Sequence, residues 1–185
     1  MINEIMITEK YYVRDLETVV KLFILPLRKG GVLPAERQEE IFANWELLLR
    51  VNTEIRDSLM QDFEAAGDIQ LMNVGRTFIS MVPSLRIYSI YAAHQKDSMQ
   101  ILEDLRVANK QFGQLLTEAE AKPDCKGVNL LGFLIKPIQR ICKYPLLFRV
   151  RSHAKTLHTL SPCTYLTTHA TRCAGTVAVH ARVAL

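Results

Sequence analysis

The sequence predicts an all-α domain without a sheet, because apolar residues recur at steps of three and four along most of the chain. No segment sustains the strict alternation of apolar and polar residues that a half-buried strand shows. The 185 residues suffice for one domain with a substantial core, and hydrophobic residues make up 49% of them against 23% charged. We therefore expect one globular helical domain.

The first predicted helix covers residues 2–23, where one apolar stripe ends before Pro26 and the Gly-Gly pair that follows it. A second helix is predicted to begin near Pro34, where three glutamates suit the positive end of a helix dipole. Its stripe continues to about residue 65, and Asp68 is a candidate cap for the next helix.

A third helix is predicted over residues 69–82, and Pro83 is expected to break or kink the path before a helical pattern resumes. Another helix is predicted over residues 96–121. A loop over residues 122–128 precedes a last helix, which we expect Asn129 to cap and which runs to about residue 151.

The composition excludes several classes of protein. No segment approaches the roughly 18 apolar residues that a membrane span requires. The first ten residues contain Glu4 and Glu9, where a secretory signal would have a basic start and an apolar block. The four cysteines follow no framework spacing, so we interpret them as free thiols. We expect a cytoplasmic protein.

Glu9 lies within the apolar stripe of the first predicted helix, in line with Leu16 and Phe23 at 100° per residue. A carboxylate there must be paired, or must lie where the stripe leaves the core. The first interpretation is an internal ion pair with a lysine or arginine of another helix. The second is a charge held at the edge of the bundle for a partner. Periodicity alone favours the ion pair.

The last predicted helix is apolar on one side and carries Lys136, Gln139 and Lys143 on another, because steps of three, four and seven return to the same face. Such a strip is most often a solvated face. Taken alone, the spacing favours that reading over a functional surface.

Two stretches of this sequence resemble a known family. Residues 8–16, TEKYYVRDL, are similar to the first conserved region of Dbl homology domains. Residues 134–147, LIKPIQRICKYPLL, are similar to the third, whose core is a Pro-x-Gln-Arg-x-x-Lys-Tyr-x-Leu-Leu pattern. Between them, residues 41–52 and 74–94 resemble the middle helices in order and separation. The resemblance covers about residues 1–150.

The resemblance implies an elongated multi-helix bundle that acts as a guanine nucleotide exchange factor. Such domains bind a Rho-family small GTPase, remodel its two switch segments and promote release of GDP without covalent chemistry or a cofactor. Carried over onto this sequence, the family's first-region glutamate is Glu9, which would contact the first switch. Gln139 and Lys143 would face the second switch, with Lys136 beside them. Arg140 belongs to the same candidate surface, although its counterpart equally serves internal pairing.

The resemblance ends a few residues beyond the third region. Family members continue into a further long helix that supplies an asparagine, whereas residues 152–185 contain no Asp, Glu, Asn or Gln. We therefore expect an incomplete Dbl homology domain over residues 1–151, with its last helix missing or replaced. The tail over residues 152–185 is interpreted as the product of a changed frame or an unspliced intron; the alternative is a true linker. The lipid-binding pleckstrin homology domain that usually follows is absent from this sequence.

Other functions are less well supported by the residues. An exchange-inactive scaffold that kept the fold is the nearest alternative, because the terminal asparagine is missing. A zinc site in the histidine- and cysteine-containing tail matches no common ligand spacing. A Gly-rich phosphate loop, a His-Glu-x-x-His pair and a nucleophile elbow are all missing from the sequence, which argues against a hydrolase or transferase. Over most of the chain the basic residues are balanced by acidic ones, so we expect no binding to nucleic acid.

Overall fold

A computed structural model of the chain describes residues 2–69 and 72–152, and for residues 148–152 it describes the backbone alone. Within these residues every regular element is a helix, so the predicted all-α class is confirmed. The calls made for the tail after residue 152, the zinc alternative among them, lie outside the described residues. The elements in chain order are α1 (Ile2–Val19), η1 (Val20–Ile24), α2 (Leu25–Gly30), α3 (Ala35–Phe42), α4 (Trp45–Ala66), α5 (Val74–Met81), η2 (Ser84–Arg86), α6 (Ile87–Ala108), α7 (Lys110–Glu120), η3 (Pro123–Cys125), α8 (Leu130–Leu134) and α9 (Lys136–Ser152).

The first helix continues further than the sequence predicted. Pro26 does not end it, because the preceding turn, η1, widens into a π-helical turn in which the Leu25 N–H bonds to the Val20 carbonyl. This wider turn leaves room for a proline that has no N–H to donate. The chain remains helical to Gly30, and Gly31 ends it in the left-handed conformation at φ 60°.

Two helices that the sequence predicted as continuous are divided. The second predicted helix is broken at Ala43, whose φ is 46°, so α3 and α4 are separate segments. The helix predicted over residues 96–121 is broken at Asn109, whose side chain accepts from the Phe112 N–H and caps α7. In the same way Asn73, and not Asp68, caps α5 by accepting from the Arg76 N–H.

The last predicted helix is also divided. Asn129 caps α8 as expected, by accepting from the Gly132 N–H at 2.9 Å. A turn at Ile135 then separates α8 from α9. Pro137 has no N–H to donate, which a continuous helix would require at that position. At the start of α9 the missing N–H is tolerated, because the first turn of a helix leaves its N–H groups unpaired.

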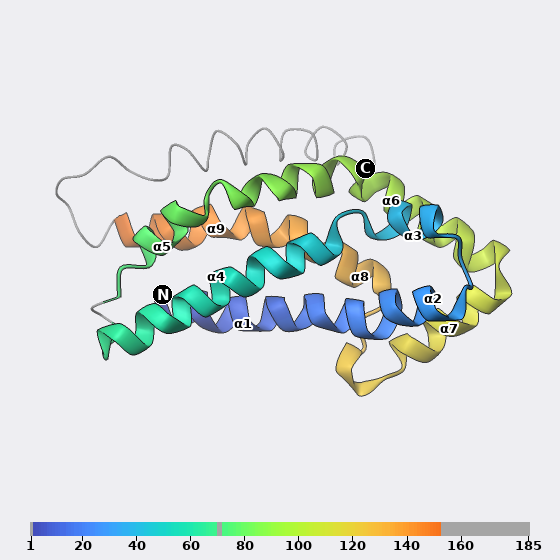
Figure 1. Ribbon diagram of the computed structural model, residues 1–185, viewed down its shortest axis with the longest axis horizontal. Helices are drawn as coiled ribbons and strands as arrows, with labels where there is room; N and C mark the ends of the chain where they lie inside the picture. Colours follow the sequence, from blue (N-terminus) through green and yellow to red (C-terminus); the bar gives the residue numbers. More distant parts are fainter. Residues whose placement is uncertain (1, 70–71, 153–185) are drawn as a thin grey trace.

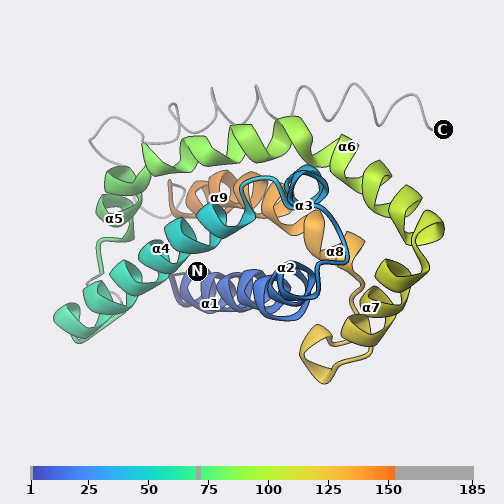
Figure 2. The same cartoon turned by 45° about the vertical axis from the view of Figure 1, so that its right-hand side comes forward.

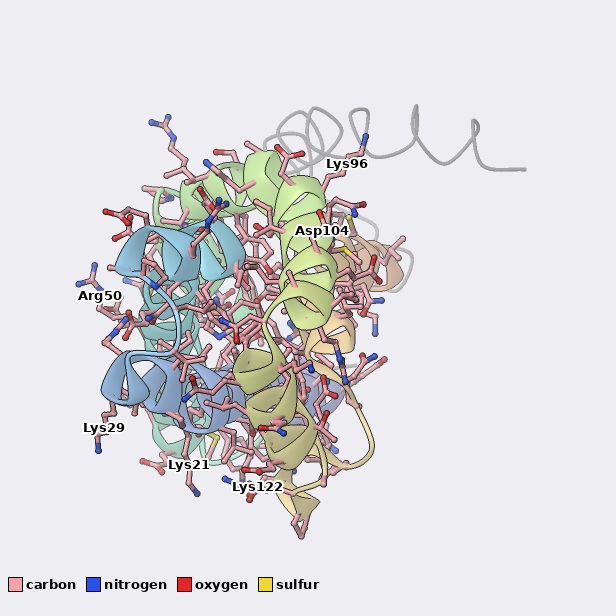
Figure 3. All side chains as sticks on the ribbon, turned by 90° about the vertical axis from the view of Figure 1, so that its right-hand side faces the viewer. Lys21, Lys29, Arg50, Lys96, Asp104 and Lys122 are labelled. Atoms are coloured by element: carbon pink, nitrogen blue, oxygen red, sulfur yellow. The ribbon has the colours of Figure 1, made fainter. Side chains whose placement is uncertain are left out.

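The long helices lie side by side in an elongated bundle. In Figure 1, α1 runs along the bottom, α4 crosses obliquely above it, α6 runs along the top and α9 lies between α4 and α6. Figure 2 shows α6 arching over α4 and α9, with α7 descending at one end. Seen from that end, charged side chains such as Lys29 and Lys122 project outward, as a solvated exterior requires (Figure 3).

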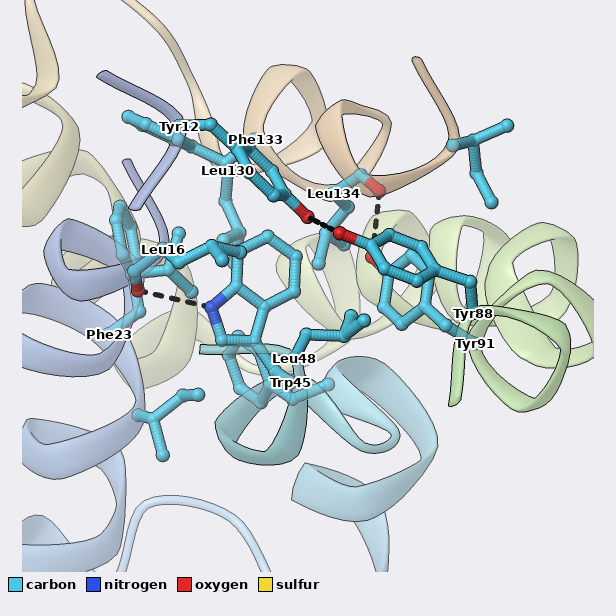
Figure 4. Packing of buried hydrophobic residues seen from close by; sticks show 14 of the residues in the cluster. Tyr12, Leu16, Phe23, Trp45, Leu48, Tyr88, Tyr91, Leu130, Phe133 and Leu134 are labelled. Atoms are coloured by element: carbon cyan, nitrogen blue, oxygen red, sulfur yellow. Dashed lines mark hydrogen bonds between the residues drawn. The ribbon is translucent and has the colours of Figure 1, made fainter. Parts of the chain in front are cut away.

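The core forms where α1, α4, α6 and α8 meet. Trp45 at the start of α4 is buried there, and its indole N–H donates to the Leu16 carbonyl at 3.1 Å (Figure 4). The Trp45 ring meets the edge of Tyr91 with a centroid separation of 5.8 Å, and the Tyr91 hydroxyl donates to the Leu134 carbonyl. These contacts link α1, α4, α6 and α8.

A candidate partner surface on α1 and α9

The candidate residues lie on two helices that pack side by side, α1 and α9. Lys136, at the start of α9, reaches Asp15 late in α1, whereas Arg140, one turn further, reaches Glu9 and Thr8. Residue numbers rise along α9 as they fall along α1, so the two helices run in opposite directions. This packing brings together residues 8–16 and 134–147, the two segments that resemble the conserved regions of the family.

Glu9 is fully buried between the two helices, with 0% of its surface exposed. Its Oε2 accepts from the Arg140 guanidinium, at 3.1 Å from Nε and with a second contact from Nη2. Oε2 also accepts from the Tyr144 hydroxyl at 2.9 Å. Of the two interpretations that the sequence left open, the described geometry is that of the internal ion pair. A direct role of Glu9 at a partner surface stays a prediction.

The other carboxylate oxygen of Glu9 is unusual. Oε1 is buried but has no hydrogen-bond partner among the described residues. A buried oxygen without a donor costs about 1–3 kcal/mol, and more when it carries charge. Burial raises the pKa of Glu9, while the charge of Arg140 and its hydrogen bonds oppose that rise. The site therefore contains an acceptor that the described residues leave unused.

Arg140 holds Glu9 from the buried side of α9. Its side chain is 5% exposed and its Nη1 donates to the Thr8 hydroxyl at 2.9 Å. Burial lowers the pKa of Arg140, but the neighbouring Glu9 charge and Tyr144 outweigh burial and raise it above its ordinary value. Arg140 is therefore a permanent cation facing inward, and it does not share a surface with Gln139 and Lys143.

The predicted polar strip of α9 is present at the surface. Gln139 and Lys143 are exposed and, within the described part of the chain, Lys143 forms no ion pair. Lys136 is about one-quarter exposed, with its ammonium 2.7 Å from Asp15 Oδ2 and 4.4 Å from the centre of the Phe133 ring. At one end of the strip Lys136 is therefore paired with α1, and at the other end Lys143 is exposed to solvent.

Sequence reasoning did not single out the polar residues that join Glu9 to the rest of the bundle. The Tyr144 hydroxyl lies 3.2 Å from Asn52 Oδ1, and Tyr88 donates to the same oxygen at 2.9 Å. The hydroxyls of Tyr88 and Tyr12 are 3.2 Å apart (Figure 4). We call the whole set the buried polar network: Glu9, Arg140, Tyr144, Asn52, Tyr88 and Tyr12.

One signal could have revealed the network. Asn52 lies in the apolar stripe of α4, so a buried amide there requires partners for its oxygen and nitrogen. The tyrosines gave no such signal, since a tyrosine in a stripe is usually interpreted as apolar. Burial raises the pKa of both Tyr88 and Tyr144, so the network keeps its hydroxyl protons at neutral pH.

The described residues offer little for covalent or metal chemistry. They contain no group of three or more His, Cys, Asp or Glu side chains that could hold a metal ion. Among the helices that the structure describes, none is long and apolar enough to cross a membrane. The described residues do include the exposed Gln139 and Lys143 on α9 and, between α1 and α9, a buried carboxylate with one oxygen lacking a donor.

Comparison with known proteins gives a consistent result. The family model described as "RhoGEF domain" matches residues 1–159. Myosin-M heavy chain of Dictyostelium discoideum is 37% identical over 149 residues, which is 80% of this chain and 8% of that protein. Intersectin-1 of Homo sapiens is 26% identical over 149 residues, 80% of this chain and 9% of that protein. This chain spans about a tenth of the length of these relatives.

Solved structures show the same fold. The linker-DH/PH domains of p115-RhoGEF superpose with a TM-score of 0.80 at 22% identity, covering 93% of this chain and 55% of that one. The DH/PH fragment of PDZRHOGEF, crystallised in complex with human RhoA, gives a TM-score of 0.80 at 19% identity, covering 94% and 50%. At these identities the similarity establishes the helical bundle.

Proposed function

Because this chain belongs to the RhoGEF domain family, we propose that it binds a Rho-family small GTPase and accelerates the release of GDP from it. Family relatives have been crystallised with RhoA, which supports the class of partner. The proposed reaction is not covalent. An exchange factor binds the nucleotide-free GTPase more tightly than the nucleotide-bound one, and by reciprocity it weakens nucleotide binding.

One observation carries the proposal of a site. On α9, Gln139 and Lys143 are exposed, and Arg140 of the same helix holds Glu9 of α1, whose Oε1 is buried without a donor among the described residues. We propose that Gln139, Lys143 and Lys136 contact the second switch segment of the GTPase. Glu9 would accept from a donor of the first switch through Oε1, and Arg140 would hold its other oxygen in place.

The surface around the strip has the composition of a binding site. Leu146 lies one turn beyond Lys143 on the same face of α9 and is 60% exposed. Tyr11 lies one turn from Asp15 on α1, is 52% exposed and has the Arg14 guanidinium 5.1 Å from its ring centre. Exposed aromatic and apolar side chains next to charged ones are typical of interface hot spots.

Lys136 is the residue of the strip that must rearrange. Its pairing with Asp15 occupies the ammonium in the free chain. The two side chains keep about one-quarter of their surface in solvent, and a solvent-accessible pair is worth only about 0–1 kcal/mol, so a stronger acceptor on the partner can replace Asp15 at little cost.

The test measures release of a fluorescent GDP analogue from purified Rho- and Rac-type GTPases, with and without the chain. We expect faster release from at least one of them, and Lys143→Ala to reduce that acceleration about tenfold, as removal of an interface cation does. Lys96→Ala on α6 is the matched control, since Lys96 is an exposed lysine on a helix outside the α1–α9 surface. If no GTPase responds while one still binds, the chain is an exchange-inactive scaffold, and the proposed activity is wrong.

A further inference from the structure

The buried polar network extends from Glu9 across the bundle to α6, far beyond the residues that can touch a partner. Its hydrogen bonds join α1, α9, α4 and α6 in turn. At the junction, the Tyr144 hydroxyl has one proton and two acceptors, Glu9 Oε2 at 2.9 Å and Asn52 Oδ1 at 3.2 Å. A tyrosine hydroxyl donates one hydrogen bond at a time, so the two acceptors compete for it.

Asn52 is held in one orientation. Its amide nitrogen donates to the Leu48 carbonyl at 2.7 Å, which leaves Oδ1 facing the two tyrosines. Tyr88 donates to that oxygen at 2.9 Å, the shorter of the two tyrosine contacts with Oδ1. With Tyr88 as the nearer donor to Asn52 Oδ1, and with Glu9 Oε2 as the nearer acceptor of Tyr144, the proton of Tyr144 goes to Glu9.

We propose that Tyr88, acting through Asn52 and Tyr144, is a positioning residue for Glu9 in the exchange reaction; this rests on the function proposed above. With Tyr144 and Arg140 both bonded to Oε2, the carboxylate is fixed and Oε1 is the oxygen left for a donor of the GTPase. Tyr88 is buried on α6 and is connected to Tyr144, and so to Glu9, through Asn52.

Removal of the Tyr88 hydroxyl is expected to weaken the hydrogen bond from Tyr144 to Glu9. Asn52 Oδ1 then has only Tyr144 as a donor, so the Tyr144 proton shifts toward Asn52 and Glu9 loses a hydrogen bond. Losing a donor disfavours the ionised carboxylate and raises the pKa of Glu9 further. The charged and titratable groups that face Glu9 are otherwise unchanged: Arg140 and Tyr144 from α9, Arg56 from α4 and Tyr12 from α1.

The chain provides a matched control on the same helix. Tyr91 is also a buried tyrosine of α6, but its hydroxyl donates to the Leu134 carbonyl at 2.7 Å, outside the network. Tyr88→Phe and Tyr91→Phe therefore each remove one buried hydroxyl: the first loses the contacts with Asn52 and Tyr12, and the second loses the bond to the Leu134 carbonyl. If buried tyrosines here serve only stability, the two variants behave alike.

The first experiment does not depend on a GTPase. The carboxyl carbon of Glu9 is titrated by NMR in the wild-type chain and in both variants. We expect its midpoint to move to higher pH in Tyr88→Phe and to stay unchanged in Tyr91→Phe. Tyr144→Phe removes the donor to Glu9 directly and provides the same test, with the same expected direction, if Tyr88→Phe does not fold. An unchanged midpoint in the folded variant would overturn the proposal.

The second experiment measures nucleotide release. We expect Tyr88→Phe to lower the exchange rate roughly threefold to tenfold, the usual size of coupling through a buried network, and Tyr91→Phe to leave it unchanged. In a Glu9→Gln background, Tyr88→Phe should have no further effect. Equal losses in the two tyrosine variants would reduce Tyr88 to a structural role. If the wild-type chain releases nucleotide from no GTPase, the proposed function fails, whereas the carboxyl titration still decides whether Tyr88 controls Glu9.

Discussion

The buried ion pair between α1 and α9 is the feature whose perturbation we can work out most fully. Arg140→Met keeps an unbranched side chain of similar length but removes the charge that faces Glu9. Glu9 then stays fully buried with only the Tyr144 hydroxyl as a donor. Removal of one partner of a buried pair costs about 3–5 kcal/mol, because the other charge is left uncompensated. For a domain with a total stability of roughly 5–15 kcal/mol, this is a large fraction.

Urea unfolding followed by circular dichroism measures this cost. At a slope of about 2 kcal/mol per M, a loss of about 4 kcal/mol lowers the urea midpoint by roughly 2 M. Arg37→Met is the control, since Arg37 pairs with Glu40 and the two side chains are 52% and 42% exposed, and such a pair is worth about 0–1 kcal/mol. Glu9→Leu combined with Arg140→Met should recover most of the loss, because a buried pair replaced by apolar groups is often neutral.

The pH dependence of the Arg140→Met variant gives an independent check. Burial raises the pKa of Glu9, and the loss of Arg140 removes the main opposing charge, so the folded-state pKa rises further above the unfolded value of 4.5. The folded variant then binds a proton more tightly than the unfolded chain. The contribution of Glu9 to the stability of the variant is therefore greatest below pH 4.5 and falls as the pH rises toward the raised folded-state pKa. A deficit under about 1 kcal/mol at pH 7, or one that does not shrink in acid, would refute this reasoning.

Two further predictions concern packing. Gly113→Ala should destabilise the chain by about 1–3 kcal/mol, because an added Cβ would lie 2.8 Å from the Arg106 carbonyl oxygen; Gly75→Ala, whose nearest contact is 3.6 Å away, should be neutral or up to about 1 kcal/mol stabilising. Leu48→Ala in the core should cost about 2–5 kcal/mol, whereas Leu25→Ala, at a position 40% exposed, should cost under about 1 kcal/mol. Thermal or urea unfolding measures all four, and a smaller loss for Gly113→Ala than for Gly75→Ala would contradict the close approach of α6 and α7.

The sequence predicted that the chain is helical but not where the helices break. The stripe from Ile41 to Leu59 reads as one helix because Trp45 and Leu48 stay in phase, yet Ala43 adopts a positive φ and divides it. Both α3 and α4 pack on α6, and an alanine with positive φ between them has no signal in the sequence. The wide turn before Pro26 was missed for a similar reason, since a proline signals a helix end more often than a π-helical turn.

The candidate site was predicted in part. The strip of Lys136, Gln139 and Lys143 follows from helical spacing alone, and its place at the surface of α9 agrees with that spacing. The partner of Glu9 could not be predicted, because Arg140 is 131 residues away in sequence and only the antiparallel packing of α1 and α9 joins them. Asn52 and Tyr88 lie on two other helices, and only the packing of those helices brings them together.

The most direct test of the central claim compares the affinity of this chain for one GTPase in its nucleotide-free and GDP-bound forms. Acceleration of exchange requires that the chain prefer the nucleotide-free form, and the preference sets the largest effect that it can have on GDP binding. We predict tight binding to a nucleotide-free Rho-family GTPase, dissociation of that complex by excess GDP and magnesium, and a weakened complex with Lys143→Ala. Equal affinity for the nucleotide-free and GDP-bound forms would contradict the proposed exchange activity.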